Sequence, residues 1–326
     1  MTVVTSDIAA AAQLLASGHL CAIPTETVYG LAADASSSTA VARIFEAKNR
    51  PQDHPLIVHV ADYETALLWF DALPVWAQEL ARSCWPGPLT LVGNRTQLAT
   101  DQITGGQHTV AVRIPAHPMA RALLVELKQV GVPGLVAPSA NRFGHVSPTT
   151  AEHVAADLGA YLAQHGDGIL DGGPSEIGIE STIVLATGSS PRILRPGAIG
   201  TELIESITGI SVDAGSEGAP RVSGALASHY SPDAQVTVIA DQGHEDFQAN
   251  SGLIALKDIP TPAGVTRLAS PADSNDFASQ LYEAMRQGDQ LNLHQIYVVL
   301  PTRSGIGVAI ADRVAKAAFV QTQEPS

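Results

Sequence analysis

Apolar and polar positions along the chain follow two periods, and each period predicts one kind of element. Helical spacing predicts helices near residues 6–17, 38–48, 74–84, 117–128 and 149–158. Short apolar runs predict strands near residues 20–24, 56–60, 89–93, 109–114, 134–138, 181–187 and 192–195. Ser6 is a plausible cap for the first helix and Gly18 its stop. Such alternation predicts an α/β domain in which strands that follow one another directly pair antiparallel.

The pattern breaks down between Ile210 and Asp233, where the chain is rich in Gly, Ser, Ala and Pro. This composition indicates a linker. Beyond it, apolar runs predict strands at 235–240, 252–256 and 294–301, and helical spacing predicts helices at 273–288 and 306–319. We therefore expect a larger α/β domain at 1–205, a linker at 206–234 and a smaller α/β domain at 235–326.

The overall charge excludes some classes of function. The 326 residues include 32 Asp and Glu against 18 Lys and Arg, which gives a formal net charge of −14. A dedicated nucleic-acid binder usually carries a basic stripe, and this sequence has none, so any cationic site must be local. Cys21 and Cys84 lack CxxC spacing, which predicts reduced thiols and no disulfide or zinc site. Without a signal peptide or a run of 18 apolar residues, we expect a cytoplasmic protein with no membrane span.

Cationic side chains gather at one helix-to-strand junction, EAKNRPQDHPLIVHV, residues 46–60. Lys48 lies on the last helical turn and Arg50 just after it, where both could be solvated partners of the helix dipole. However, two prolines stiffen the loop, and strand ends in α/β folds bind ligands, so two cations here also suit a phosphate chain. His54 and His59 could be ordinary polar residues or ligands, and spacing leaves both interpretations open.

Other polar residues stand in unusual places. Thr27, in PTETVYGLAADA, could satisfy a turn or hydrogen-bond a small polar substrate. Arg113 lies in the apolar strand TVAVRIP, where it needs either a structural ion pair or a substrate carboxylate. Ser139, in APSANRFGHVSPTT, lacks the GxSxG context of a nucleophile, and the glycine-rich DGGPSEIGIESTIV is neither a Walker nor a dinucleotide loop. Arg195, in RILRPGAI, could be a solvated loop arginine.

Taken together, seven segments occur in one order that resembles the YrdC-like domain of the threonylcarbamoyl-adenylate synthases. They are PTETVYGLAADA, KNRP..HPLIVHV, WPGPLTLV, VAVRIPAHP, PSAN..GHVSPT, GIESTIV and ILRPG, and the similarity covers about residues 8–205. SHYSP and GIGVAIADRVAKAA, further along, resemble the long two-domain form of that family. The resemblance implies a YrdC-like twisted mixed sheet with helices, followed by a smaller Rossmann-like α/β domain.

The resemblance also implies an activity. Enzymes of this family are nucleotidyltransferases that condense L-threonine, bicarbonate or CO2 and ATP into threonylcarbamoyl-AMP and pyrophosphate. The product serves the N6-threonylcarbamoyladenosine (t6A) modification of tRNA. Mg²⁺ is then expected to enter with ATP, and downstream tRNA threonylcarbamoyl-transferase proteins to receive the adenylate. Neither tight tRNA binding nor a membrane partner is expected.

The family's functional residues carry over onto positions of this sequence. Lys48 and Arg50 fall at catalytic positions. ATP contacts fall on Arg50, His54, Thr109, Ser139, Ser147, Arg195 and Tyr230. L-threonine contacts fall on Thr27, His59, Arg113, Ala137 and Ser181, and no protein metal ligand is expected. At the position of His54 the family frequently has Asn, and Tyr230 falls where the long form folds back over the nucleotide.

Two rival interpretations remain. A non-catalytic RNA-binding module would show a broad basic face and would not need Arg113. A carbamoyl-adenylate enzyme of hydrogenase maturation would carry zinc fingers, which two cysteines cannot build. The role of the C-terminal domain is open, and one hypothesis is that it gates the active site together with the linker.

Overall fold

The computed structural model describes residues 3–215, 218–224, 230–240 and 247–319. These residues form two compact units. The first comprises residues 1–143, 148–176 and 180–225, and the second comprises 144–147, 177–179 and 226–326. The first unit thus continues into the segment assigned above to a linker, of which residues 216–217 and 225–229 lie outside the described residues.

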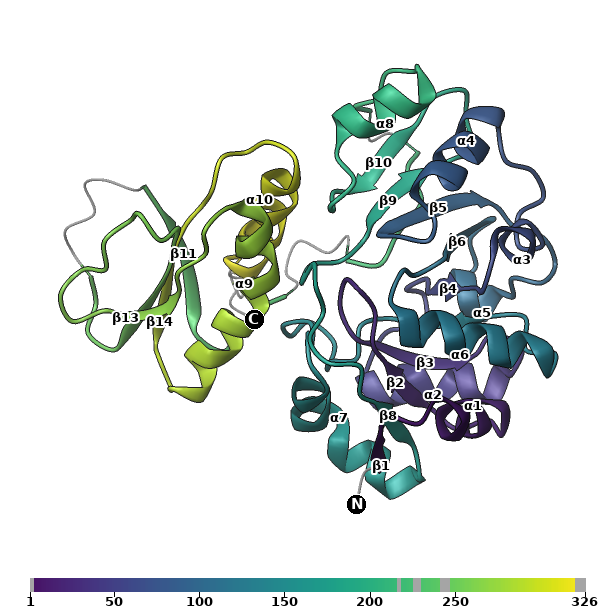
Figure 1. Cartoon of the computed structure of the whole chain (residues 1–326), viewed down its shortest axis with the longest axis horizontal. Helices are drawn as coiled ribbons and strands as arrows, with labels where there is room; N and C mark the ends of the chain where they lie inside the picture. The colour runs from purple at the N-terminus through teal and green to yellow at the C-terminus, as the bar shows by residue number, and fades with distance from the viewer. Residues whose placement is uncertain (1–2, 216–217, 225–229, 241–246, 320–326) are drawn as a thin grey trace, which may run out of the picture. The chain divides into compact units, whose positions relative to one another are not determined.

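A ten-stranded mixed sheet forms the first unit (Figure 1). Its strand order is β1-β8-β2-β3-β7-β4-β6-β5-β9-β10. The bounds are β1 (Val3–Thr5), β2 (Cys21–Ile23), β3 (Gly30–Asp34), β4 (Ile57–His59), β5 (Leu89–Asn94), β6 (Thr109–Arg113), β7 (Leu135–Val136), β8 (Gly168–Leu170), β9 (Thr182–Leu185) and β10 (Arg192–Arg195). The successive strands β2 and β3, β5 and β6, and β9 and β10 pair antiparallel, which confirms the expected mixed sheet.

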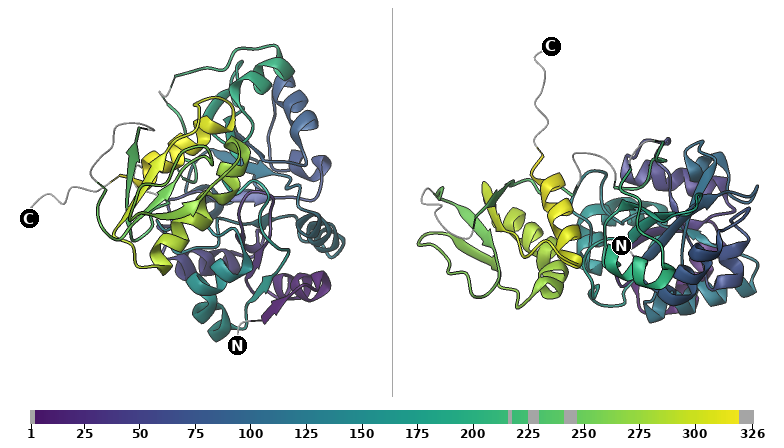
Figure 2. Two further views of the ribbon diagram at one scale, coloured as in Figure 1. Left: turned by 60° about the vertical axis from the view of Figure 1, so that its left-hand side comes forward. Right: turned by 90° about the horizontal axis from the view of Figure 1, so that it is seen from above.

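Helices cover the sheet of this unit in the views of Figures 1 and 2. Their bounds are α1 (Ile8–Ala16), α2 (Ser38–Lys48), α3 (Tyr63–Leu67), α4 (Val75–Cys84), α5 (Asp101–Thr104), α6 (Pro118–Gln129), α7 (Ala151–His165) and α8 (Thr201–Thr208). The predicted cap of α1 was wrong by one residue. Asp7, not Ser6, is the N-cap, and its carboxylate accepts hydrogen bonds from the amides of Ala9 and Ala10.

Strand alternation sends buried side chains into two separate cores. Leu20 and Ala22 belong to the larger core, to which residues of α2, α4 and α7 also belong, whereas Cys21 and Ile23 belong to the smaller core with residues of α1 and α6. Burial raises the pKa of the Cys21 thiol to about 12, so it is an unreactive core residue at neutral pH. Both cysteines are free and buried, as expected.

Several short elements were not predicted. Strands β1 and β8 have three residues each, too few to show a period. Strand β3 was not predicted either, because GLAAD consists mostly of small residues that are buried without alternation. Helix α8 (Thr201–Thr208) runs across residue 205, where the sequence placed the end of the first domain.

The second unit contains a parallel four-stranded sheet of order β11-β14-β12-β13, which confirms the expected smaller α/β fold. Its elements are β11 (Gln235–Ile239), β12 (Ser251–Ile254), β13 (Thr266–Ala269), α9 (Ser274–Gln290), β14 (Gln295–Val299) and α10 (Ile306–Ala317). Within this unit Tyr230 stacks on Tyr282, with ring centroids 5.8 Å apart, and the guanidinium of Arg313 lies 5.1 Å from the Tyr230 ring centre.

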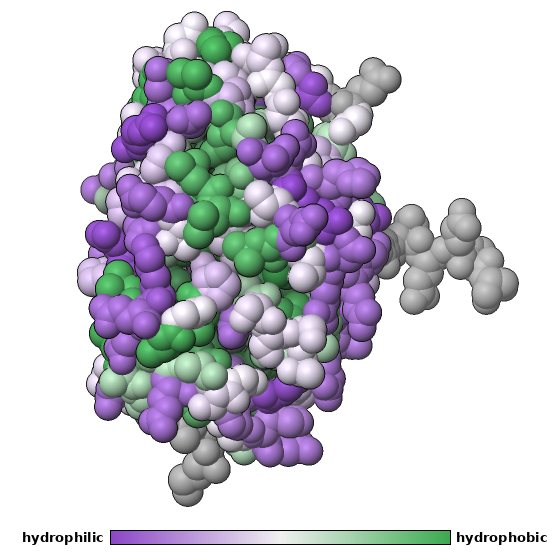
Figure 3. Space-filling view, turned by 90° about the vertical axis from the view of Figure 1, so that its right-hand side faces the viewer, coloured by the Kyte–Doolittle hydropathy of each residue, from purple (hydrophilic) through white to green (hydrophobic). Residues whose placement is uncertain are grey.

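The outer surface of the first unit carries a few exposed apolar side chains. Leu67 and Leu68 at α3, and Val125 and Val130 at α6, are among them, and Figure 3 shows apolar residues along this face between polar ones. Exposed apolar residues are normal on protein surfaces, so this face indicates no binding function by itself. Within the described part of the chain, no helix combines the length and the apolarity that a membrane crossing requires.

Candidate active site

Strand register brings polar side chains to one face of the first unit's sheet. His59 at the end of β4 is paired with Arg113 at the end of β6, and Arg113 is paired in turn with Thr90 of β5. Because side chains alternate along a strand, Thr109 lies on the same face of β6 as Arg113. The intervening Val112 belongs to the large core on the opposite face.

Arg113 is the most heavily bonded of these residues. Its side chain is 4% exposed, and Nη2 forms an ion pair with Oε1 of Glu26 at 2.6 Å. Nη1 donates to the Thr27 hydroxyl at 2.8 Å, and Nε donates to the Gly87 carbonyl at 3.2 Å. The structural ion pair weighed above therefore exists. The three contacts together occupy one N–H of each nitrogen, so a second N–H on Nη1 and on Nη2 can still bind a substrate carboxylate.

Hydroxyl groups fix the orientation of Thr27. The Thr25 hydroxyl donates to the carbonyl of Val28 at 2.6 Å and therefore accepts from the Thr27 hydroxyl, 2.8 Å away. Thr27 in turn accepts from Arg113. Both threonines are buried, so the TET segment forms a rigid polar wall beside Arg113.

His59 is a neutral imidazole in this site. It is 3% exposed, and Nδ1 lies 3.3 Å from the carbonyl oxygen of Ile57. Burial, followed by the positive charge of Arg113, lowers the pKa of His59 to about 3. At neutral pH His59 can therefore exchange hydrogen bonds with a substrate but carries no charge.

The pKa of His59 predicts a pH-dependent stability. The unfolded chain binds a proton at this histidine near pH 6.5, while the folded chain does not until about pH 3, so stability is lost as pH falls below 6.5. Between pH 7.5 and pH 5 the loss from His59 should be about 2 kcal/mol. We expect His59→Gln to lose less stability over this interval, as measured by urea unfolding at both pH values. Equal losses in the two proteins would contradict a neutral, buried His59.

Arg195 forms a second cationic centre and is buried, so its interpretation as a solvated loop residue was wrong. It ends β10, and its Nη2 donates to the hydroxyl and carbonyl oxygens of Ser181 at 3.1 and 3.0 Å. The Ser181 hydroxyl is also 2.8 Å from that of Thr90, the neighbour of Arg113. Ser181 thus links the two arginine centres.

Close backbone packing holds the Ser181 segment in place. A Cβ at Gly197 would lie 2.3 Å from the amide nitrogen of Thr182 and 2.8 Å from the carbonyl oxygen of Glu180. We expect Gly197→Ala to destabilise the first unit by about 1–3 kcal/mol through overpacking, measured by urea unfolding. Gly188→Ala is the control, since a Cβ there meets nothing within 4 Å. An unchanged midpoint for Gly197→Ala would refute this packing argument.

Lys48 and Arg50 are both buried, so the alternative of solvated dipole partners was wrong. Lys48 Nζ donates to the carbonyl of Ser139 at 2.6 Å and to that of Asn141. Burial, reinforced by the charge of Arg50, holds the pKa of Lys48 well below its usual value. Asn49, between the two cations, adopts the left-handed conformation with φ of 51°, and this ends α2.

Arg50 lies between the loop of residues 51–55 and the chain after α8. Its Nη2 donates to the Pro55 carbonyl at 3.1 Å and to the Ser223 hydroxyl at 3.3 Å. Its guanidinium is 5.7 Å from the ring centre of Phe143, which His54 contacts edge-on at 5.3 Å. His54 and Arg50 therefore lie against the same aromatic ring.

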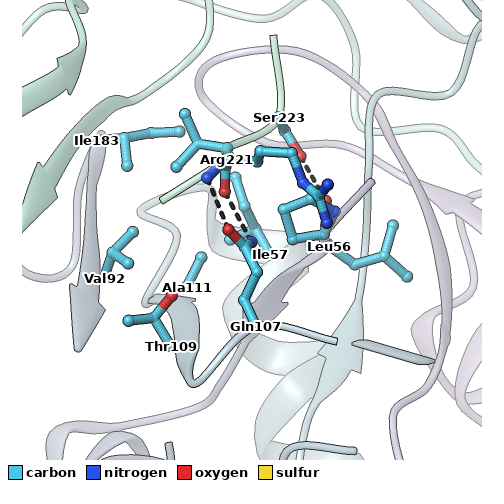
Figure 4. A pocket seen from close by; sticks show the side chains of 11 residues that line it. Leu56, Ile57, Val92, Gln107, Thr109, Ala111, Ile183, Arg221 and Ser223 are labelled. Atoms are coloured by element: carbon cyan, nitrogen blue, oxygen red, sulfur yellow. Dashed lines mark hydrogen bonds between the residues drawn. The ribbon is translucent and has the colours of Figure 1, made fainter. Parts of the chain in front are cut away.

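Residues 221–223, predicted as part of the linker, line a pocket on this sheet face (Figure 4). The side chain of Gln107 exchanges two hydrogen bonds with the backbone of Arg221, at 2.7 and 3.0 Å. Val222 packs on an apolar floor formed by Ile57, Val92, Ala111 and Ile183. Thr109, a predicted ATP contact, lines the same pocket.

Ser223 connects the cations of this region. Its hydroxyl accepts from Arg50, and its carbonyl oxygen accepts from Arg195 Nη1 at 3.0 Å. A continuous series of hydrogen bonds therefore runs from Thr90 through Ser181, Arg195 and Ser223 to Arg50. The geometry suits a ligand with a carboxylate near Arg113 and a more highly charged anion near Arg50 and Arg195.

Most predicted site residues belong to the first unit: Thr27, Lys48, Arg50, His54, His59, Thr109, Arg113, Ala137, Ser139, Ser181 and Arg195. Ser147 and Tyr230 belong to the second unit, where both are buried. The described residues contain no cluster of three or more His, Cys, Asp or Glu suited to a metal ion.

Glu26, Thr90 and Ser223 were missed as site residues. The demand of a buried Arg113 for an anionic partner was the one signal that pointed to Glu26.

Comparison with known proteins agrees with this arrangement. The Sua5–YciO–YrdC family, described as telomere recombination, matches residues 13–197, and the C-terminal domain of threonylcarbamoyl-AMP synthase matches residues 199–319. The threonylcarbamoyl-AMP synthase of Bacillus subtilis is 38% identical over 96% of this chain and 93% of its own length. That of Pyrococcus abyssi is 38% identical over 94% and 92%. The crystal structure of P. abyssi Sua5 complexed with L-threonine matches with a TM-score of 0.83 at 34% identity, covering 98% of this chain and 97% of that chain.

Proposed function

The chain belongs to the Sua5–YciO–YrdC family and is an enzyme of the two-domain threonylcarbamoyl-AMP synthase type, and from this premise we propose its substrates and site. It condenses L-threonine, bicarbonate or CO2 and ATP into threonylcarbamoyl-AMP and pyrophosphate. The observation that carries the proposal is the hydrogen-bonded series that joins Arg50 to Arg195 and ends at Thr90, the strand partner of Arg113. A carboxylate and a triphosphate are the anions that such centres accommodate.

The L-threonine subsite lies at the ends of β4 and β6. Arg113 binds the α-carboxylate with the N–H groups that Glu26, Thr27 and Gly87 leave available. His59, Ser181 and the backbone at Ala137 lie on the strands around it and supply polar contacts. The match to a relative whose structure was determined with L-threonine supports this placement.

The ATP subsite lies around Arg50 and Arg195. Both side chains are buried and currently bonded to Ser223, so their orientation is fixed before the nucleotide arrives. Lys48, His54, Thr109 and Ser139 complete this region in the first unit. Ser147 and Tyr230 belong to the second unit, and their contact with ATP stays a prediction. Mg²⁺ is part of the substrate MgATP and is held mainly by the phosphates, since the described residues offer no cluster of three or more His, Cys, Asp or Glu that could bind it.

Mechanistically, the amine of L-threonine adds to CO2 and loses a proton, which gives a carbamate. A carbamate oxygen then attacks the α-phosphorus of ATP, so that a new P–O bond forms while the bond to the β-phosphate breaks and pyrophosphate leaves. The side chains supply position and charge rather than covalent chemistry. Arg113 aims the carbamate by holding the carboxylate, and Arg50, Arg195 and Lys48 stabilise the charge that moves onto the leaving pyrophosphate.

In the cell the adenylate is the activated donor for t6A formation in tRNA. A downstream threonylcarbamoyl-transferase takes it up, so this chain needs no tight contact with tRNA. The net charge of −14 supports a function without tight tRNA binding.

The test is pyrophosphate release by the purified protein with ATP, Mg²⁺ and bicarbonate, with and without L-threonine. We expect release that depends on both L-threonine and bicarbonate, and a product with the mass of threonylcarbamoyl-AMP. If no mixture releases pyrophosphate, the proposed reaction is wrong, and salt-dependent RNA binding becomes the function to test.

A further inference from the structure

The two oxygens of the Glu26 carboxylate differ in their hydrogen bonds. Its Oε1 is paired with Arg113 at 2.6 Å, whereas Oε2 is buried and has no hydrogen-bond partner. The side chain is 6% exposed. A buried carboxylate oxygen without a donor is costly, and such groups in folded proteins usually have a ligand or a functional reason.

Glu26 is ionised in the folded protein. Burial alone would raise the pKa of Glu26, but the charge and hydrogen bond of Arg113, together with the backbone amides of Glu26 and Ala116, outweigh burial and hold it below its usual value. The pocket therefore presents a negative and a positive group side by side, with unused acceptor capacity on Glu26 and unused donor capacity on Arg113.

We propose that Glu26 is the residue that binds the α-amino group of the amino-acid substrate through its free Oε2. This assignment rests on the proposed function and deepens it. An amino acid is a zwitterion whose ammonium and carboxylate flank a single carbon. Placed against Glu26 and Arg113, it sets each of its charges beside the opposite charge of the protein. The four charges then neutralise one another within a buried site, which repays their loss of water.

The neighbouring groups leave this role to Glu26. The Thr27 hydroxyl already donates to Thr25 and accepts from Arg113, and His59 is neutral, so neither offers a negative acceptor. Ordinary ion pairing does not explain the geometry, because a carboxylate retained only to neutralise Arg113 would be expected to satisfy both of its oxygens. Glu26 would also hold the nitrogen that must add CO2. It would therefore select carboxylic acids that carry an α-amino group over acids that lack one.

The experiment compares the binding of two ligands to the full-length protein by calorimetry without ATP. One ligand is L-threonine, and the other is 3-hydroxybutanoate, which keeps the carboxylate and hydroxyl but lacks the amine. We expect Glu26→Gln to weaken L-threonine binding by about 10- to 100-fold, the worth of a charge-assisted hydrogen bond, and to change 3-hydroxybutanoate binding by less than about three-fold. Asp167→Asn, which also removes a buried carboxylate paired with an arginine, is the matched control and should alter neither affinity.

Two other outcomes would overturn the assignment. If both ligands bind more tightly to Glu26→Gln, then Glu26 only occupies the carboxylate place on Arg113 and must be displaced. If both bind more weakly by the same factor, then Glu26 only orients Arg113. Failure of the unchanged protein to bind L-threonine would instead overturn the proposed function, and this assignment with it. Glu26→Asp provides a second variant that keeps the charge if the Gln variant does not fold.

Discussion

Replacing Arg113 with alanine is expected to lower kcat/KM for L-threonine about 10²- to 10⁴-fold, because the α-carboxylate loses two charge-assisted hydrogen bonds worth about 1.5–3 kcal/mol each. The affinity for ATP should change little, since Thr90 and Ser181 lie between Arg113 and the nucleotide region. Pyrophosphate release at varied L-threonine and fixed ATP, beside nucleotide binding measured separately, checks both parts of the prediction.

The alanine variant also leaves Glu26 buried without its cation, which typically costs about 3–5 kcal/mol. The double variant Arg113→Ala/Glu26→Gln removes that orphan charge and should recover much of the lost stability, measured by urea unfolding. It should stay inactive, and at least about ten-fold below Glu26→Gln alone. If the double variant regains the activity of Glu26→Gln, then Arg113 serves folding and not the substrate.

The main helices and central strands could be predicted from the sequence because their apolar residues repeat with a clear period. Helix α2 buries Val41, Ile44 and Phe45 on one side, and that spacing is visible in the sequence. Strand β3 could not be predicted in this way, since it lies in the middle of the sheet and is buried without alternation. Its fold depends on pairing with β2 and β7, which a local pattern does not contain.

Half of the site could be anticipated for a similar reason. A lone arginine in the apolar strand TVAVR requires an anion, which singled out Arg113. Which anion it meets is a matter of tertiary structure: Glu26 is one of 32 acidic residues, and 87 positions separate the two. Ser223 was harder still, because it lies in a segment whose composition indicates a linker, yet it contacts both Arg50 and Arg195. Composition predicts the absence of regular structure but does not exclude specific contacts.

Replacing Arg50 with alanine is expected to lower kcat about 10²–10³-fold, the usual effect of removing one group that stabilises developing charge. Arg50 is buried and held by Pro55 and Ser223, so its guanidinium is oriented in advance toward the anion. Binding of L-threonine should persist, because Arg113 is held by Glu26, Thr27 and Gly87, whereas Arg50 is held by Pro55 and Ser223. The measurement is single-turnover formation of threonylcarbamoyl-AMP at saturating ATP, beside L-threonine calorimetry.

Arg50→Lys and Arg192→Ala separate charge from geometry in this prediction. Lysine keeps the charge but not the planar fork, so Arg50→Lys should recover only part of the rate if a phosphate chain is gripped at two points. Arg192 lies three residues before Arg195 but is paired with Asp213 at the edge of the sheet, so Arg192→Ala should keep nearly full activity. If Arg50→Ala instead raises KM for ATP with kcat unchanged, Arg50 contributes equally to the ground state and the transition state. Its role would then be nucleotide capture, and stabilisation of the leaving pyrophosphate would fall to Arg195 and Lys48.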